Sequence, residues 1–284
     1  MPRYKLTVEY DGTGLVGWQR QDNGPSVQGL LEAAILRLCG ETVTLAAAGR
    51  TDAGVHATGQ VAHADIEKPM DPERVRDGLN YWLRVQAEEA GQGTPVAVRE
   101  AEIAPDGFHA RFSATSRHYL YRIANRRAPP TLTRAAVWWL ARPLDVDQMA
   151  EGAHRLVGHH DFSTFRASEC QASSPIKTLD YLSVERRGEE VLVWAGARSF
   201  LHHQVRNMVG SLILVGNGRW TPDDIARALE AKRRAAGGPT APPHGLCLIR
   251  VGYSAAGKGD AVGDVADQHA KEEIDHHQQS GVPG

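Results

Sequence analysis

Hydrophobic and polar residues alternate along the first segment of the chain. The stretch RYKLTVEY, residues 3–10, places an apolar side chain at every second position and is followed by Asp-Gly. A period of two is typical of a half-buried strand, and Asp-Gly is typical of a turn. Apolar residues then recur at helical spacing over residues 27–38, between the capping residue Ser26 and Gly40. We therefore expect a strand, a loop and a helix in this part of the chain.

Two extended runs and a second helix complete the first half. The runs TVTLAAAG (residues 42–49) and GQVAHAD (residues 59–65) flank a turn centred on Asp52. A helix is predicted to follow Asp71, a capping residue with proline after it, and TPVAVREAEI (residues 94–103) is predicted to be a strand. The order strand, helix, strand, strand, helix, strand is the split βαβ pattern of a ferredoxin-like unit with an antiparallel sheet.

The second half repeats this plan loosely. Strands are predicted over residues 115–125, 176–187, 189–200 and 245–253, helices over 146–156, 201–216 and from Thr221 onward, and a long loop over 157–175. We therefore predict an α+β protein with two similar ferredoxin-like halves, residues 1–107 and 108–255. Their antiparallel sheets are expected to join into one central sheet with the helices packed outside. The cleft at the junction is the expected place for an active site.

Charge is balanced over the whole chain but unevenly distributed. There are 32 Lys and Arg residues against 34 Asp and Glu, and residues 256–284 hold six of the acids with two lysines. That last stretch is dominated by small, polar and charged residues and is predicted to be a disordered acidic tail. Between Asp106 and Asp145 the chain has no acid and seven arginines. Such a run is typical either of a phosphate-binding surface or of a solvated face.

Cysteine usage and hydropathy bear on the cellular setting. Three scattered cysteines, Cys39, Cys170 and Cys247, favour a reducing cytoplasm over a disulfide framework or a zinc site. No apolar run approaches the ~20 residues of a membrane-spanning helix, and the first residues lack the apolar core of a signal peptide. We expect a cytoplasmic protein without a membrane segment.

Asp52 is the first candidate for chemistry. An aspartate two residues before a glycine commonly accepts its own downstream amides in an Asx-turn, which would make it structural. Alternatively, a carboxylate on a loop between strands, with Arg50 beside it, is placed to act as a general base or a nucleophile. The local residues leave both roles open.

A glycine motif near the start of the chain is a weak indication of a dinucleotide-binding site. The run GTGLVG (residues 12–17) has the spacing of a dinucleotide-binding fingerprint, but a polar loop follows where that fingerprint requires a helix. We therefore expect no nucleotide cofactor. The same loop carries Trp18 and Arg20, which suit contacts to base, sugar or phosphate if the tryptophan is exposed, whereas a buried Trp18 would be an anchor.

The histidines do not predict a metal site. The pairs His159-His160 and His202-His203 are the obvious candidates. Adjacent residues on a helix point about 100° apart, and neither pair has the i, i+4 spacing of a helical zinc site. We expect neither pair to converge on one ion.

Seven motifs in order resemble one family. They are YDGTGLVGWQRQ, SVQGLLEAAI, AGRTDAGVHATGQVAH, DGFHARFSATSRHYLYRI, DFSTFRA, FLHHQVRNMVGSL and the GL before the last predicted strand. Together they resemble the tRNA pseudouridine synthase A family from Tyr4 to about Tyr253. The resemblance implies an enzyme that isomerises uridine to pseudouridine at positions 38, 39 and 40 of the tRNA anticodon stem-loop. It also implies a homodimer that uses neither metal nor organic cofactor.

The resemblance assigns roles to individual residues. Asp52 is implied to be the catalytic aspartate, and Arg206 to pair with it. Tyr119 is implied to pack on the target base, and Arg50 to hold the place of the flipped-out nucleotide. Relatives often carry an aromatic residue where this chain has Cys247, so that position is given no role.

The arginine run agrees with an RNA substrate. We expect Arg20, and the arginines from Arg111 to Arg142, to contact phosphates of the RNA backbone. An alternative of another class is a non-catalytic tRNA-binding or RNA-chaperone module on the same fold. Product formation distinguishes the two.

Overall fold

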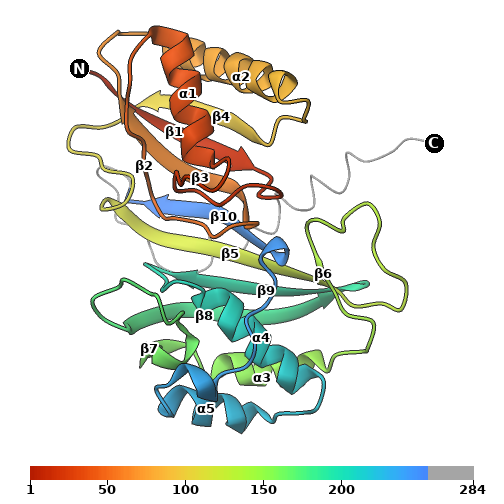
Figure 1. Cartoon of the computed structure of the whole chain (residues 1–284). Coiled ribbons are helices and arrows are strands. Elements are labelled where there is room, and N and C mark those ends of the chain that lie inside the picture. The colour runs from red at the N-terminus through yellow and green to blue at the C-terminus, as the bar shows by residue number, and fades with distance from the viewer. Residues whose placement is uncertain (255–284) are drawn as a thin grey trace. The chain divides into compact units, whose positions relative to one another are not determined.

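The first half of the chain forms a small α+β unit in the computed structural model, which describes residues 1–254 (Figure 1). Its elements are β1 (Arg3–Tyr10), α1 (Val27–Cys39), β2 (Ala46–Ala47), β3 (His56–Asp65), α2 (Pro72–Glu89) and β4 (Val96–Ile103). β1 pairs antiparallel with β3 on one side and with β4 on the other. The predicted order of elements is confirmed, although β2 is only two residues long.

The predicted caps explain where the two helices begin. The Ser26 hydroxyl accepts the N–H of Gly29 at 3.2 Å, and Gly40 ends α1 in the left-handed conformation, with φ of 84°. The Asp71 carboxylate caps α2, and Pro72 is its first residue. A cap of this kind is worth about 1 kcal/mol because it satisfies an amide that the helix leaves unpaired.

The second half adds a larger group of strands and three α-helices. Its elements are β5 (Ala114–Ala124), β6 (Trp138–Trp139), α3 (Val146–His154), β7 (Gly158–Asp161), β8 (Ile176–Arg187), β9 (Glu190–Ala197), α4 (Gln204–Gly216), α5 (Pro222–Glu230) and β10 (Leu246–Tyr253), with short 3₁₀ turns between them. β8 and β9 form a hairpin, and β9 pairs antiparallel with β5.

Two short strands depart from the sequence-based prediction. β7 lies inside the segment predicted to be a loop and pairs antiparallel with β8, while β6 pairs with the end of β5. The β7 sequence, GHHD, has no alternation of apolar and polar residues. Its strand conformation comes from the neighbouring strand, which is tertiary context that a local pattern does not carry.

One sheet joins the two halves in the described part of the chain. The strands follow the order β4-β1-β3-β10-β5-β9-β8-β7, with β2 and β6 paired beside β3 and β5. β10 lies between β3 and β5 and pairs parallel with β3, with Cys247 opposite His56 and Leu248 opposite Ala57. The predicted central sheet is confirmed, and it is antiparallel at most of its pairs. The boundary between residues 107 and 108 stays a prediction, and the tail predicted over 256–284 lies outside the described residues.

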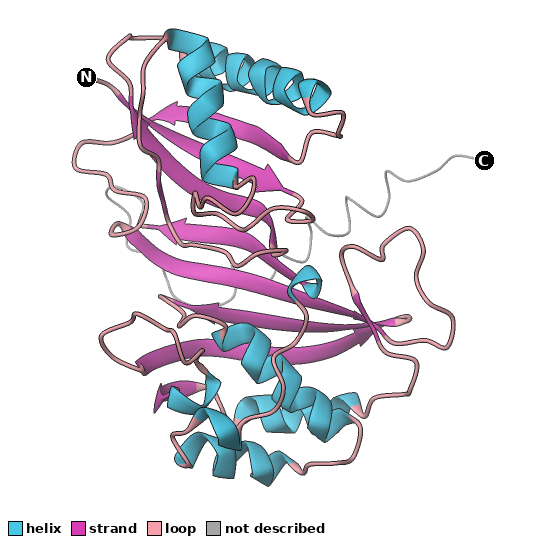
Figure 2. Cartoon of the chain, viewed as in Figure 1, coloured by secondary structure: helices cyan, strands magenta, loops and turns pink. Residues whose placement is uncertain are grey.

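The helices gather in two groups beside the sheet (Figure 2). α1 and α2 contact each other, and α2 contacts β4. α3 contacts β8, α4 and α5. The prediction of helices outside a central sheet is confirmed. Within residues 1–254 no helix has the length and apolar character needed to cross a membrane.

α4 is held by a close backbone approach at Gly210. Eleven of its thirteen residues are buried. The Pro239 carbonyl crosses the helix so closely that a Cβ added at Gly210 would lie 1.7 Å from its oxygen. The same segment continues to Ala241, whose N–H donates to the Arg206 carbonyl at 3.1 Å. Only glycine therefore allows the segment 239–241 to lie directly on α4.

Gly210→Ala is expected to destabilise the protein because the added methyl group overlaps a backbone carbonyl. Overpacking of this kind costs about 1–3 kcal/mol, which corresponds to a fall in melting temperature of roughly 2–4 °C per kcal/mol for a protein of this size. Thermal unfolding followed by circular dichroism measures it. The control is Gly93→Ala, where the added Cβ meets open space. Equal melting temperatures for the two variants would contradict the packing described.

Candidate active site

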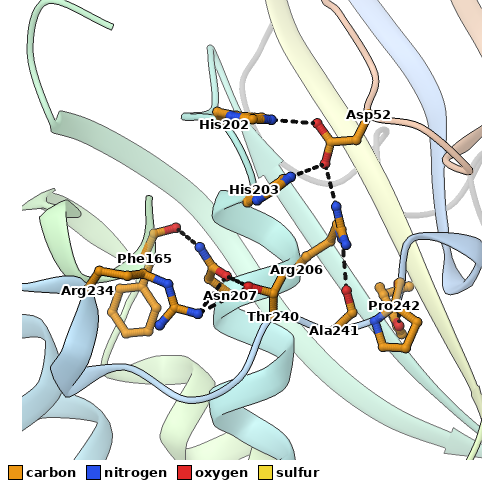
Figure 3. Close-up of polar contacts among 11 residues, drawn as sticks. Asp52, Phe165, His202, His203, Arg206, Asn207, Arg234, Thr240, Ala241 and Pro242 are labelled. Atoms are coloured by element: carbon orange, nitrogen blue, oxygen red, sulfur yellow. Dashed lines mark hydrogen bonds and ion pairs between the residues drawn. The ribbon is translucent and has the colours of Figure 1, made fainter. Parts of the chain in front are cut away.

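In the turn that carries Asp52, the backbone closes the turn and the side chain contacts other residues. The Val55 N–H donates to the Asp52 carbonyl at 3.1 Å, which closes the turn. The carboxylate points instead to residues 202–206 of the second half (Figure 3). The Asp52 side chain is 21% exposed. A backbone-closed turn thus leaves this carboxylate at the junction of the two halves, where a site was expected.

The glycine motif supports this turn from beneath. The Trp18 N–H donates to the Thr51 carbonyl at 3.1 Å, and the Gly54 N–H donates to the Leu15 carbonyl at 3.3 Å. Gly17 has a φ of 100°, and a Cβ there would lie 2.5 Å from the Thr51 oxygen. The first helix begins ten residues later, at Val27, so the glycines serve close backbone packing and not a helix N-terminus. Trp18 is buried, which makes it an anchor of the loop.

Buried polar groups fix the other side of the turn. The hydroxyl groups of Tyr10 and Thr51 lie 2.8 Å apart, and the Gln60 amide donates to the Gly49 carbonyl at 2.8 Å. All three of these polar side chains are buried. Because a buried polar group is costly unless it is paired, this set favours one backbone path into Asp52.

Arg206 reaches Asp52 from the first turn of α4. Its Nη1 lies 2.8 Å from Asp52 Oδ2, and its Nε donates to the Ala241 carbonyl at 2.8 Å. The planar guanidinium group makes both bonds with its fixed donor geometry. The arginine side chain is 12% exposed. The predicted pair of Asp52 and Arg206 is therefore present, and the segment 239–241 orients it.

Two histidines that were not predicted for the site also face the carboxylate. His202 Nε2 lies 3.3 Å from Asp52 Oδ1, and His203 Nε2 lies 3.3 Å from Asp52 Oδ2 (Figure 3). The prediction that adjacent histidines diverge was wrong here because neither belongs to the helix. His203 is the residue before α4 and has a left-handed φ of 62°. This turn brings both imidazole rings to one side, with centroids 4.0 Å apart. The motif FLHHQVRNMVGSL contained the signal, but only its arginine was assigned a role.

The same three residues have the spacing of a metal site. Ligand atoms of Asp52, His202 and His203 all lie within 4.8 Å of one another. The Arg206 guanidinium group, however, already contacts the carboxylate. A fixed positive charge at that point opposes a cation by direct repulsion. The donor set suits a hydrogen-bonded carboxylate better than a metal ion.

Burial shifts the pKa of two side chains in the site, His203 and Tyr119. It lowers the pKa of His203, while the negative charge of Asp52 opposes that shift. Tyr119 on β5 is buried, and its ring packs edge-to-face against Phe200 with centroids 5.2 Å apart. Burial, and secondarily the charge of Asp52, raises the pKa of Tyr119. Its hydroxyl group is therefore protonated and able to donate a hydrogen bond.

A second polar network, centred on Asn207, holds α4 in place. The Asn207 amide donates to the Phe165 carbonyl at 2.9 Å, and its oxygen accepts from Thr240 at 2.7 Å and from Arg234 at 3.1 Å (Figure 3). Asn207 is buried. The network joins the motif DFSTFRA, the helix and the segment that ends at Ala241. It thereby ties the carbonyl that orients Arg206 to the same helix that carries Arg206.

The remaining predicted site residues lie at the surface. Arg50 is exposed two residues before Asp52. The Arg20 guanidinium group lies 3.1 Å from Glu32, with its side chain 67% exposed. Arg111 is exposed, and its guanidinium carbon lies 5.8 Å from the centre of the Phe112 ring. Among the interactions of the described residues, no hydrogen bond or ion pair joins Arg20, Arg50 or Arg111 to the Asp52 carboxylate. Their roles toward RNA stay predictions.

The arginine run is not a uniform surface. Arg117 is buried and donates to the carbonyls of Ala48, Arg111 and Arg198. Arg122 pairs with Glu190 at 2.8 Å, and Arg126 pairs with Glu189 at 2.7 Å. The exposed members that remain are Arg111, Arg127, Arg134 and Arg142. A phosphate-binding role for the run stays a prediction.

Most of the chain is similar to known proteins. A family model described as tRNA pseudouridine synthase matches residues 6–113 and 153–254. The chain is 62% identical to the tRNA pseudouridine synthase A of Paramagnetospirillum magneticum, over 90% of this chain and 97% of the relative. It is 59% identical to that of Nitrobacter hamburgensis, over 89% of this chain and 100% of the relative, and 55% identical to that of Rhizobium meliloti, with the same two coverages.

Asp52→Asn is expected to lower the pKa of His203 further. Burial already holds this pKa below its ordinary value of about 6.5, and the Asp52 carboxylate is the main charge that opposes the shift. Without that charge, burial and the nearby Arg206 act with less opposition. An NMR titration of the imidazole nitrogens measures the change, with His159 on β7 as the internal control. An unchanged or higher pKa for His203 would contradict the geometry.

Proposed function

The chain belongs to the tRNA pseudouridine synthase family, and we propose that its site at Asp52 converts uridine to pseudouridine at positions 38, 39 and 40 of the tRNA anticodon stem-loop. The observation that carries this proposal is the Asp52 carboxylate held by Arg206 across the junction of the two halves, at 2.8 Å. Asp52 lies on a loop of one half, and Arg206 lies on a helix of the other. The family resemblance also supports a cytoplasmic homodimer.

The target uridine must leave the base stack before it can react. Unstacking a base costs a few kcal/mol, and enzymes that act on bases offset this cost with contacts to the flipped base and to the gap it leaves. Tyr119 is the candidate to pack on the flipped uracil, since its ring is held by Phe200 and its hydroxyl group is protonated. Arg50, exposed on the same turn as Asp52, is the candidate to occupy the gap.

The reaction breaks one bond to the sugar and makes another. The C1′–N1 bond is cleaved, the uracil turns while it stays bound, and C5 bonds to C1′. N1 gains a proton and C5 loses one, so the reaction is an isomerisation without net oxidation. Asp52 either attacks C1′ to form a covalent adduct or removes a sugar proton to give a glycal. Both routes use its carboxylate as an anion.

The two carboxylate oxygens of Asp52 contact different neighbours. Oδ2 contacts Arg206 and His203, whereas Oδ1 contacts His202, whose side chain is 41% exposed. Oδ1 therefore has fewer charged or hydrogen-bonding neighbours than Oδ2 among the described residues, and it is the oxygen that we assign to the reaction. Arg206 then orients the carboxylate through the oxygen that does not react, which is a way to preorganise a nucleophile or base.

We assign binding of the tRNA body to the exposed arginines. Arg20 and Arg111 are candidates to contact the RNA backbone, and Arg127, Arg134 and Arg142 are exposed on the same half as Arg111. Guanidinium groups suit phosphates because their donors match phosphate oxygens in pairs. Each phosphate contact adds to the salt dependence of binding.

Asp52→Asn is expected to keep tRNA binding within about twofold and to abolish turnover. Loss of a general base or nucleophile costs about 10²-fold at the least, while the amide keeps the shape of the side chain. Tritium release from [5-³H]uridine-labelled tRNA measures turnover, and a filter assay measures binding. The control is Asp77→Asn, an exposed carboxylate on α2.

Near wild-type turnover by Asp52→Asn would contradict the proposed role of this residue. Wild-type protein that binds tRNA without forming pseudouridine would instead favour the non-catalytic binding module.

A further inference from the structure

A turn outside the Asp52 site exposes a large aromatic ring. Phe112, between β4 and β5, is 72% exposed. Phenylalanine is one of the residues most often buried, whereas this ring lies open to solvent. Its sequence neighbour Arg111 is also exposed and has its guanidinium carbon 5.8 Å from the centre of the ring.

The turn from His109 to Ser113 is closed by its own hydrogen bonds. The Ser113 N–H donates to the His109 carbonyl at 2.9 Å, and the His109 N–H donates to the Ser113 hydroxyl at 2.9 Å. The imidazole Nδ1 of His109 accepts the N–H of Arg111 at 3.1 Å. With these bonds the turn holds itself together, and it does not need to bury Phe112 to keep its shape.

The turn is also bonded to the segment that leads into the active site. One amino group of Arg117, Nη2, donates to the Arg111 carbonyl at 3.0 Å and to the Ala48 carbonyl at 2.7 Å. Ala48 lies just before Arg50 and Asp52 in the chain. His63 of β3 accepts the Ala110 N–H at 3.2 Å. Arg117 thus joins the turn that carries the exposed ring to the segment that leads to Asp52.

The surroundings of the ring indicate the chemistry of its partner. The His109 and Phe112 rings have centroids 4.4 Å apart and an angle of 36° between their planes. An aromatic ring beside a guanidinium group and an imidazole suits a flat base with a phosphate attached. A protein partner would favour apolar neighbours around such a ring, but its ring contacts among the described residues are with the polar His109 and the basic Arg111.

We propose that Phe112 and Arg111 form a stacking subsite for an unpaired nucleobase of the tRNA, distinct from the target uridine. The subsite rests on the proposed function, and it adds a base contact to the phosphate contact predicted for Arg111. The target uridine is assigned to Tyr119, which is buried, whereas Phe112 lies open to solvent. The subsite takes any base, because stacking on an aromatic ring does not read hydrogen-bonding edges.

Phe112→Ala tests the subsite. We expect it to raise the Kd and the KM for tRNA by about fivefold to a hundredfold, the range for loss of one stacked base, with kcat unchanged. Phe112→Trp is expected to restore binding because the indole ring also stacks. The matched control is Leu132→Ala, which removes another exposed apolar side chain, 96% exposed, and is expected to leave binding unchanged.

A second measurement locates the base. Anticodon stem-loops that carry 2-aminopurine at one unpaired position at a time report stacking by quenched fluorescence. We expect wild-type protein to quench one position, other than the target, more than Phe112→Ala does. A merely structural role for Phe112 would not produce a difference confined to one position.

The outcomes separate the subsite from the function on which it rests. Binding by Phe112→Ala within twofold of an active wild-type enzyme overturns the subsite alone, as does equally weak binding by Phe112→Trp. A change in oligomeric state of Phe112→Ala, measured by light scattering, assigns the ring to a contact between copies of the chain and also overturns the subsite. A wild-type protein that forms no pseudouridine overturns the proposed function itself.

Discussion

A single ion pair between distant parts of the chain is the contact on which the site depends. Arg206 and Asp52 lie 154 residues apart in sequence, and their side chains meet at 2.8 Å. A charge-assisted hydrogen bond of this kind is worth about 1.5–3 kcal/mol, which is small beside the cost of ordering two segments. The pair therefore cannot assemble the site, and the fold has to bring its two members together.

The fold meets this requirement through the last strand and two close backbone approaches. β10 lies between β3 and β5, so the sheet is continuous where the two halves join. On one side the glycine motif packs directly against the Thr51 carbonyl, and on the other Gly210 lets Pro239 lie directly on α4. Backbone carbonyl and N–H groups then hold Asp52 and Arg206 in place, so the carboxylate oxygens of Asp52 are not used to close its own turn. A carboxylate held in this way is preorganised for chemistry.

Local periodicity predicted most of the fold, and the site came from resemblance. Strong alternation and well-marked caps, as at Ser26 and Asp71, predicted the long strands and helices. β6 and β7 were missed because neighbouring strands impose their conformation. The pair of Asp52 and Arg206 has no local signature, since no spacing in sequence shows which helix faces which turn. His202 and His203 were misjudged because they were placed on the helix that begins after them.

The central claim is that the Asp52 carboxylate reacts while Arg206 holds it from the second half of the chain. The most direct measurement is a structure of the Asp52→Asn chain bound to its tRNA substrate. The account predicts an unstacked uridine with its C1′ beside the side chain at position 52, Tyr119 against the uracil, and Arg206 still beside that side chain. A target uridine that remains stacked in the stem-loop, or one bound away from position 52, would contradict it.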